Sequence, residues 1–551
     1  MNFKLFRRIP VDPETRKKRR KFTGLAAVAG LLSGLAFPPV PGFPLIFFAI
    51  APLLYILDSD EKLISKLRYT YLYGFIFSLI SLYWVSAVTE LKDSFLLIGG
   101  GLLQFINPVF FLIPAALFHF ARKKFGSLPA LMLMPFFWFS YEYFYMETEA
   151  NFPWLALANS VTYFKPFIQI ADLIGGPGIT VLIVYINAFV YLAFKNYTIS
   201  RKNAVAYAAA PVLLILIPVI YGLSIDQTEL TKGEKLRVGL IQPNLDPYDK
   251  WGGAELSSIV DEYMELSKKS AEKGAELLIY PETALPVYLL NGSYPAALDS
   301  FYSIARNNNV YLLTGMPDLR LHEPGEVVKG SRPVPNSKLR YSVYNSVLLF
   351  APRDREIQRY GKIKLVPFGE RVPYVEKLPF LSTFFSWSVG ISSWNEGTDT
   401  TNFRLAPFRQ FKDTVSISGI VCFESVFPVF MAEFALKGAQ MFAVVTNDSW
   451  YGNTSGPYQH KEISVLRAIE NRKYVVRAAN GGISCIIDPY GNTLASSKMF
   501  ERTEITGDVV LNREVTFYAG TARYLPAFSM TLSVFMVLLT FMIWLRSKLK
   551  I

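Results

Sequence analysis

Eight apolar runs constrain the fold of this chain most strongly. A helix needs about 20 apolar residues to span the hydrocarbon core of a bilayer, and most of the runs approach or exceed that length. They cover residues 23–40, 44–57, 69–88, 95–120, 128–145, 167–194, 204–223 and 525–545. Of the 551 residues, 51% are hydrophobic and 18% are charged, which excludes a disordered chain and favours a membrane protein. We therefore expect a multi-pass α-helical membrane domain of about eight transmembrane helices.

The loops between these runs alternate in charge. Both terminal tails and every second loop are rich in Lys and Arg, whereas the alternate loops hold one Lys or none. Because cytoplasmic loops carry the excess of Lys and Arg, both termini are expected in the cytoplasm. The long segment after the seventh run then faces outside. In a bacterium that side is the periplasm, so the chain is predicted to lie in the inner (cytoplasmic) membrane.

Domain boundaries follow from this order. We expect a cytoplasmic tail at 1–22, helices 1–7 within 23–224, a periplasmic α/β domain at 225–520, and helix 8 with its tail at 521–551. The run at 44–57 is short, so the first two runs form either two full spans or a re-entrant hairpin. The first run is read as a retained anchor and not a signal peptide, because another hydrophobic run follows at once.

Net charge and cysteine content exclude several other classes. The net charge is +12, but the basic excess lies in the short pieces between apolar runs, so no groove for nucleic acid is predicted. Two cysteines cannot form a disulfide scaffold or a four-cysteine zinc site. A single Cys422–Cys485 bridge stays open if the segment faces an oxidising compartment.

The segment after Lys235 changes to an α/β pattern. Short apolar strand candidates such as "RVGLIQPN", "AELLIYPET", "SVYNSVLLFAP" and "VSISGIVCFE" alternate with helical patterns. Two of these helices are expected at 254–274, ending at a glycine, and at 464–478. Functional side chains in α/β folds gather where strands end. Glu282, Lys362 and Cys422 each follow such a strand or its connection.

These three residue types support acyl transfer without histidine. A thiolate is the nucleophile, and a free thiol of pKa about 8.5 needs a base at neutral pH. A carboxylate in an apolar pocket can serve as that base, and a lysine can stabilise an oxyanion. The chain has three histidines, of which only His460 lies near other polar motifs, so a Cys–His dyad has one candidate and a His-rich metal site is not supported.

The motifs around these residues resemble a known family. "YPETALP", "YGKIKLVPFGERVP" and "GIVCFESVFP" carry Glu282, Lys362 and Cys422 in the order of the Glu-Lys-Cys triad of the nitrilase superfamily. Together with the membrane runs, "AFPP", "NFPWLALANS", "QIADLIGGPG" and "TNDSWYG" resemble the apolipoprotein N-acyltransferase family over nearly the whole chain. The resemblance implies an α-β-β-α sandwich for the α/β domain.

The resemblance also implies a reaction. In that family an acyl chain passes from a phospholipid to the cysteine, and then to the α-amino group of a diacylglyceryl-cysteine at a lipoprotein amino terminus. Cys422 would be the nucleophile, Glu282 the general base, and Lys362 the oxyanion stabiliser together with the backbone N–H of Phe423. Further implied are a phospholipid donor, a diacylated apolipoprotein acceptor and contact with the bilayer, with no cofactor, no metal, no nucleic acid and a monomeric state.

Supporting residues follow from the same resemblance. Glu370 and Glu424 would position Lys362 and support the pocket, and Trp251 matches a tryptophan near the substrate. Many relatives have Tyr where this chain has Phe423, and His where it has Lys364. The aromatic segment 377–394 is expected either to be core or to dip into the membrane and admit acyl chains. Its candidate substrate contacts are Phe384, Phe385 and Trp387.

Two other readings remain open at this point. A membrane-tethered nitrilase-type amidase would use the same three residues on a soluble substrate. A transporter or binding protein with an inert α/β domain would need ionisable groups in the membrane runs, where Glu142 and Asp172 are the clearest. The sequence does not specify head group, chain length or lipoprotein partners.

Overall fold

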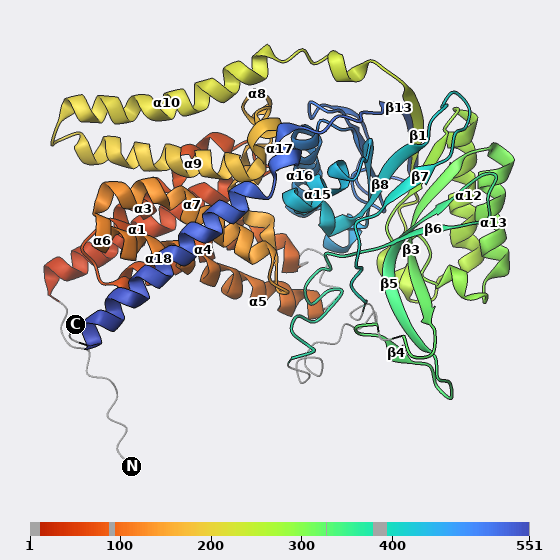
Figure 1. Ribbon diagram of the computed structural model, residues 1–551, viewed down its shortest axis with the longest axis horizontal. Coiled ribbons are helices and arrows are strands. Elements are labelled where there is room, and N and C mark those ends of the chain that lie inside the picture. The colour runs from red at the N-terminus through yellow and green to blue at the C-terminus, as the bar shows by residue number, and fades with distance from the viewer. Residues whose placement is uncertain (1–11, 87–93, 327, 378–393, 550–551) are drawn as a thin grey trace.

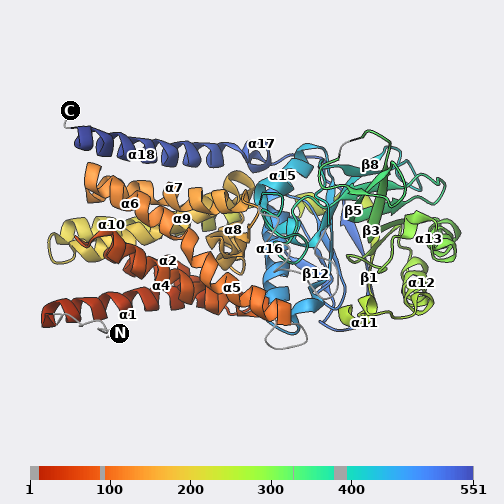
Figure 2. The same cartoon turned by 90° about the horizontal axis from the view of Figure 1, so that it is seen from below.

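The computed structural model describes residues 12–86, 94–326, 328–377 and 394–549. The described residues form a bundle of long helices and, at one end of it, an α/β domain (Figures 1 and 2). Helix α1 begins and α18 ends at the end of the bundle that lies farthest from the α/β domain. The outer ends of α1 and α18 therefore lie on the same side of the bundle.

Most of the predicted apolar runs form helices. The bundle comprises α1 (Pro13–Leu35), α2 (Ile46–Ala49), α3 (Ala51–Leu57), α4 (Leu63–Leu82), α5 (Ser94–Phe110), α6 (Leu112–Phe125), α7 (Ser127–Met146), α8 (Lys165–Ile168), α9 (Ala171–Asn196), α10 (Arg201–Ser224) and α18 (Tyr524–Leu549). Within the described residues, four helical stretches are long and apolar enough to cross a membrane: Leu96–Phe125, Ala171–Asn196, Arg201–Ser224 and Phe517–Leu549. The short predicted run at 44–57 lies in the shorter apolar stretch Phe43–Leu57, which consists of a 3-10 turn at Phe43–Leu45 followed by α2 and α3.

The α/β domain is built on two sheets. The first has the order β13-β1-β2-β3-β5-β4, with β6 paired to β5, and the second has the order β12-β11-β10-β9-β8-β7. The first contains β1 (Lys235–Gln242), β2 (Leu277–Tyr280), β3 (Tyr311–His322), β4 (Arg332–Pro333), β5 (Arg340–Phe350), β6 (Gln358–Gly361) and β13 (Thr503–Val510). The second contains β7 (Asn402–Leu405), β8 (Val415–Val421), β9 (Met441–Thr446), β10 (Val475–Ala479), β11 (Cys485–Ile487) and β12 (Thr493–Ser496).

Helices cover the outer faces of both sheets, which pack against each other. Helices α12 (Leu256–Glu272) and α13 (Pro295–Asn308) lie on the first sheet, whereas α15 (Pro428–Leu436) and α16 (Ser455–Asn471) cover the second (Figure 1). The α15–α16 layer also packs against α9 and against α17 (Phe517–Thr521). This is the α-β-β-α sandwich that the resemblance implied, with one helical layer shared between the sandwich and the bundle.

One predicted helix is wrong over its second half. The helix expected at 464–478 ends at Asn471, and the residues from Val475 form strand β10. Arg472 adopts a left-handed conformation, with φ of 49°, which ends the helix. The buried run that follows pairs with β9 and β11, so sheet pairing overrides the helical spacing.

Arg472 also fastens the sandwich to the bundle. Its guanidinium donates to Asp172 Oδ2 in the first turn of α9 and to Gln169 Oε1 just before that helix, each at 2.7 Å. It donates further to the carbonyl oxygens of Gln169 and Pro489. Asp172 is thereby paired with a buried cation, which explains an ionisable residue at this position without a transport pathway.

We predict that Arg472→Met lowers the free energy of unfolding by about 3–5 kcal/mol, because it leaves a carboxylate at the junction without its cation. The measurement is thermal unfolding of the detergent-solubilised protein, followed by tryptophan fluorescence.

The matched control is Arg513→Met, which removes an exposed arginine that lies 3.5 Å from Asp413. An exposed pair of this kind contributes about 0–1 kcal/mol. Equal shifts for the two variants would contradict the anchoring role of Arg472.

Candidate active site

Strand ends bring the three predicted residues to one edge of the sandwich. Strands β2 and β3 are parallel, and β6 runs in the same direction as β3 because both are antiparallel to β5. Glu282 follows the end of β2 and Lys362 the end of β6. Cys422 follows the end of β8 in the facing sheet. The topology therefore joins residues that are 80 and 60 positions apart in the sequence.

Lys362 lies between two carboxylates. Its ammonium nitrogen is 3.1 Å from Glu282 Oε1, 2.9 Å from Glu370 Oε1 and 2.8 Å from Glu370 Oε2. Only 1% of the residue is exposed. Burial disfavours the charged form, but the charges of Glu282, Glu370 and Cys422 outweigh it and raise the pKa of Lys362. The lysine is therefore a fixed cation.

Asn345 joins the two carboxylates from the other side. Its side-chain nitrogen donates to Glu282 Oε1 and to Glu370 Oε1, each at 2.7 Å. Its main-chain oxygen accepts from the backbone N–H of Lys362 at 2.8 Å. The amide thus spaces the carboxylates and holds the lysine backbone. The sequence offered one signal for it, a polar residue inside the buried strand "SVYNSVLLF".

Cys422 sits in a strained turn at the end of β8. Its φ is 49°, an uncommon value for a residue other than glycine. The residue is partly exposed, and its Sγ accepts a hydrogen bond from Thr446 Oγ1 at 3.2 Å. Burial of the thiol and the charge of Glu282 raise its pKa well above the ordinary value, while Lys362 acts in the opposite direction. These charge effects couple the sulfur to both other predicted residues.

Glu424 holds the lysine segment without touching the ammonium group. Its Oε1 accepts from the hydroxyl of Tyr360 at 2.6 Å and from the backbone N–H of Ile363 at 2.7 Å. Its Oε2 accepts from the backbone N–H of Val421 at 2.9 Å. Burial raises the pKa of Glu424 to about 7. The side chain therefore ties the end of β8 to the segment that carries Lys362.

The neighbouring aromatic residues Phe423 and Trp251 pack in different hydrophobic clusters. The ring of Phe423 stacks on Phe152 at a centroid distance of 5.8 Å, which places it against the bundle. Trp251 packs against a small cluster formed by Val343, Leu365 and Trp394, and its ring N–H is buried without a hydrogen-bond partner in the described part of the chain. The predicted contacts Phe384, Phe385 and Trp387 lie outside the described residues.

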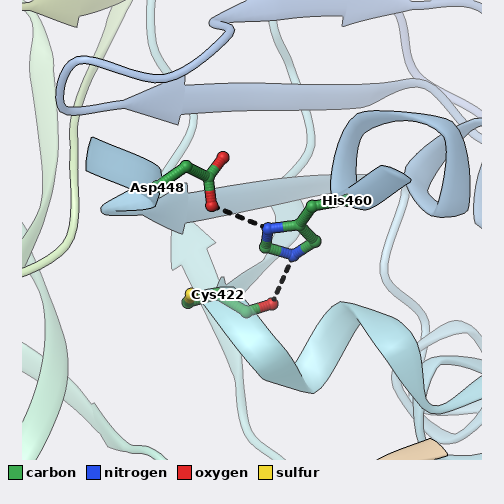
Figure 3. A group of neighbouring side chains, drawn as sticks. All are labelled: Cys422, Asp448 and His460. Atoms are coloured by element: carbon green, nitrogen blue, oxygen red, sulfur yellow. Dashed lines mark hydrogen bonds and ion pairs between the residues drawn. The ribbon is translucent and has the colours of Figure 1, made fainter. Parts of the chain in front are cut away.

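His460 does not form a dyad with the thiol. Its Nδ1 faces Asp448 Oδ1 at 2.8 Å, and its Nε2 faces the main-chain oxygen of Cys422 at 3.2 Å. Figure 3 shows the sulfur pointing away from the imidazole ring. Ligand atoms of Cys422, Asp448 and His460 lie within 4.8 Å of one another, so the three could approach one metal ion. Both histidine nitrogens are already engaged, which disfavours metal binding there.

Both cysteines are free thiols, so the Cys422–Cys485 bridge is absent. Cys485 is fully buried in β11, where burial raises its pKa to about 11. Because Cys422 is partly exposed and Cys485 is not, alkylation is expected at Cys422.

Two cavities flank the loop that carries Glu370. An apolar slot of about 140 Å³ lies between α5 and this loop, and is lined by Leu96, Leu103, Phe152, Val366, Phe368 and Tyr451 among others. A polar groove of about 130 Å³ is also lined by residues of this loop, and its charged lining comprises three basic and three acidic side chains: Lys329, Lys364, Arg371, Glu147, Glu149 and Glu396. Pro367 lines both cavities. An amphiphile can thus place an apolar chain in the slot and a charged head in the groove.

We predict that Glu282→Gln speeds alkylation of Cys422 by iodoacetamide, because removing the carboxylate charge lowers the pKa of the thiol. The expected rise is roughly threefold for each unit by which the pKa falls, since a more acidic thiolate is more abundant but less nucleophilic. The rate is measured by intact mass between pH 7 and 9. Glu265→Gln, at an exposed carboxylate on α12, is the control. An unchanged alkylation rate in Glu282→Gln would contradict an effect of the Glu282 charge on the pKa of Cys422.

Comparisons with known proteins cover both parts of the chain. Residues 237–517 match the carbon-nitrogen hydrolase family, and residues 29–189 match the apolipoprotein N-acyltransferase N-terminal domain. The chain is similar to the apolipoprotein N-acyltransferase of Chlorobaculum tepidum, with 33% identity over 91% of this chain and 93% of that protein. It is also similar to that of Geobacter metallireducens, with 29% identity over 90% of each chain.

Among solved structures, an amidase from Nesterenkonia sp. aligns with 18% identity and a TM-score of 0.36 over 52% of this chain and 95% of that one. The relative from Chlorobaculum tepidum spans nearly the whole of both sequences, and the two family matches fall on the bundle and on the sandwich. The chain therefore belongs to the apolipoprotein N-acyltransferase family.

Proposed function

We propose that this chain transfers a fatty acyl group from a phospholipid, through a thioester on Cys422, to the α-amino group of the diacylglyceryl-cysteine at the amino terminus of apolipoproteins. The observation that carries the proposal is the buried Glu282–Lys362–Glu370 cluster beside the strained thiol, in a chain whose relatives carry the acyltransferase name. The cluster supplies a base and a cation for acyl transfer.

The first half of the reaction forms the thioester. Glu282 takes the proton of the Cys422 thiol, and the thiolate attacks the ester carbonyl of the phospholipid. The negative charge moves from Glu282 to the sulfur and then to the carbonyl oxygen. Lys362 pairs with Glu282 at 3.1 Å, its charge acts on the sulfur, and it would stabilise the carbonyl oxygen. When the intermediate collapses, the lysophospholipid alkoxide leaves and takes the proton from Glu282.

The second half transfers the acyl group to the amine. The amino group of the acceptor attacks the thioester, and Glu282 takes its proton. The carbon–sulfur bond then breaks, and the proton passes from Glu282 to the leaving thiolate. Atoms and charge balance over the two halves, and no cofactor enters either one. In this ping-pong order, the donor reacts with the thiol first, and the acceptor reacts with the resulting thioester after the first product has left.

The supporting residues act through these three. Glu370 compensates the positive charge of Lys362 within the buried cluster. Asn345 fixes the distance between the two carboxylates. Glu424 sets the backbone that follows Lys362. The backbone N–H of Phe423 is proposed as a second donor to the oxyanion.

The two cavities support a lipid as the donor. The apolar slot beside Phe152 and Tyr451 suits an acyl chain, because its lining is almost wholly apolar. The groove around Lys364 and Arg371 suits a charged head group. Trp251, with its unpartnered N–H, is proposed to contact the substrate near the lysine segment.

The membrane arrangement is part of the proposal. We place the sandwich, residues 225–520, in the periplasm of a bacterium and both termini in the cytoplasm, with seven spans in 23–224 and an eighth in 521–551. The alternation of basic loops supports this placement. The site then lies at the outer face of the inner membrane, where the bundle meets the sandwich, and one chain supplies every residue of the mechanism.

A membrane-tethered amidase is less supported. It would use the same base, cation and thiol, but it gives no role to the apolar slot or to the shared helical layer. The curated relatives are also named as acyltransferases. Release of an amine or of ammonia from a soluble amide would favour this alternative.

We predict that incubation with phospholipid alone adds one acyl group to the purified protein, because the thioester accumulates when no amine acceptor is present to remove the acyl group. Intact mass measures the adduct, which Cys422→Ala abolishes and Cys485→Ala retains. Absence of an adduct with any phospholipid would contradict the proposed reaction.

We predict that a cysteine at position 299 is labelled from the outer side of the membrane and a cysteine at position 198 only from the inner side. Both positions are exposed, at Asp299 in α13 and at Thr198 between α9 and α10. The variants are made in a chain with Cys422→Ala and Cys485→Ala and are probed with an impermeant maleimide. Labelling of position 299 from the cytoplasm alone would overturn the orientation.

A further inference from the structure

Thr446 lies at the end of β9. Its hydroxyl has one hydrogen, and two acceptor atoms lie within hydrogen-bond distance of it. Its Oγ1 lies 3.2 Å from Cys422 Sγ and 2.9 Å from Asp448 Oδ1. Among the residues that the structure describes, it provides the one side-chain hydrogen bond to the sulfur. The hydroxyl can therefore turn between a carboxylate and the reacting atom.

We propose that Thr446 is a further catalytic residue, whose hydroxyl donates to Cys422 Sγ whenever the sulfur carries negative charge. The inference rests on the proposed function for its place in the reaction. In the second half-reaction the electron pair of the breaking carbon–sulfur bond moves to the sulfur, and the hydroxyl hydrogen turns toward it. The proton of the amine still travels through Glu282 to the sulfur, and Thr446 keeps its own proton throughout.

Asp448 makes this rotation feasible because it has other donors. Arg477 Nη2 donates to its Oδ2 at 3.0 Å, and His460 Nδ1 faces its Oδ1 at 2.8 Å. Although burial acts against the charge, His460 and Arg477 lower the pKa of Asp448 to about 2. The carboxylate stays ionised and keeps two partners when the hydroxyl turns away. With a neutral thiol, the same hydroxyl returns to the carboxylate.

His460 holds this arrangement at a distance from the sulfur. Figure 3 shows it bridging Asp448 and the main-chain oxygen of Cys422, while the sulfur points to the other side. The imidazole can fix the carboxylate and the strained turn together, but it does not meet the reacting atom. The group that does so from this side is Thr446. His460 and Asp448 are accordingly positioning residues.

The thiolate of this site needs such a donor. Burial and the charges of Glu282 and Asp448 raise the pKa of Cys422, whereas Lys362 and the hydrogen bond from Thr446 lower it. Lys362 is paired with two carboxylates, so its positive charge stabilises the thiolate less than an unpaired cation would. A hydroxyl aimed at the sulfur lowers the energy of the thiolate as nucleophile and as leaving group.

The test is Thr446→Val, which keeps the β-branched shape on the strand and removes the hydroxyl. The background is Cys485→Ala, so that one thiol remains. The hydrogen bond lost is to a charged group, so the pKa of Cys422 should rise by about one unit. Alkylation by iodoacetamide at fixed pH near 8 then slows about threefold, since a more basic thiolate is scarcer but more nucleophilic. Thr446→Ser, which keeps the hydroxyl, should stay close to the parent rate.

Thr506→Val is the matched control, because its hydroxyl pairs with Ser270 and lies on β13, away from the sulfur. Thr446→Ala gives the same comparison if the valine variant unfolds. An alkylation rate equal to that of the parent in a folded Thr446→Val variant would overturn the proposal. Alkylation needs no lipid, so this result is separate from any failure of acyl transfer. Slower release of the acyl group to an amine in Thr446→Val would place the effect in the second half-reaction.

Discussion

The structure depends on one buried cation held between two carboxylates. Removing Lys362 from water is unfavourable, and a buried ion pair is weak evidence for stability. The ammonium group is nevertheless paired with both Glu282 and Glu370, and the side-chain nitrogen of Asn345 donates to the same two carboxylates. Such an arrangement is costly to assemble for stability alone, and it lies beside a thiol in a strained turn. We infer that it is retained for chemistry, because proton transfer between Cys422 and Glu282 moves charge without changing the total.

The sandwich presents this cluster at the junction with the bundle. Helices α15 and α16 pack on the second sheet with one face and on α9 and α17 with the other. Arg472 and Glu470 extend this contact through hydrogen bonds to the start of α9. The ring of Phe423, next to the thiol, stacks on Phe152 of the bundle. Packing and hydrogen bonds therefore connect the site directly to the helices that would lie in the membrane.

Much of this could be predicted from the sequence, for physical reasons. Apolar runs and alternating basic loops are local signals, and so are buried strands that end in a polar residue. Glu282, Lys362 and Cys422 were each identified at a strand end, and the structure brings them together. The prediction of a helix at 464–478 was wrong in its second half, because the spacing of apolar residues indicates neither the left-handed conformation of Arg472 nor the pairing of β10 with β9. Asn345 and Thr446 were missed, since their roles depend on contacts between strands distant in sequence. His460 was considered as a partner for the thiol, but only the geometry shows that it faces the carbonyl oxygen.

The central claim is that the acyl group rests on Cys422 with its carbonyl oxygen beside Lys362. The most direct measurement is an experimental structure of the protein after incubation with phospholipid in the absence of an acceptor. The account predicts an acyl chain bonded to Cys422 Sγ and lying in the apolar slot along α5, with the carbonyl oxygen within hydrogen-bond distance of Lys362 Nζ. Acyl density on another residue, or a carbonyl oxygen turned away from the lysine, would contradict it.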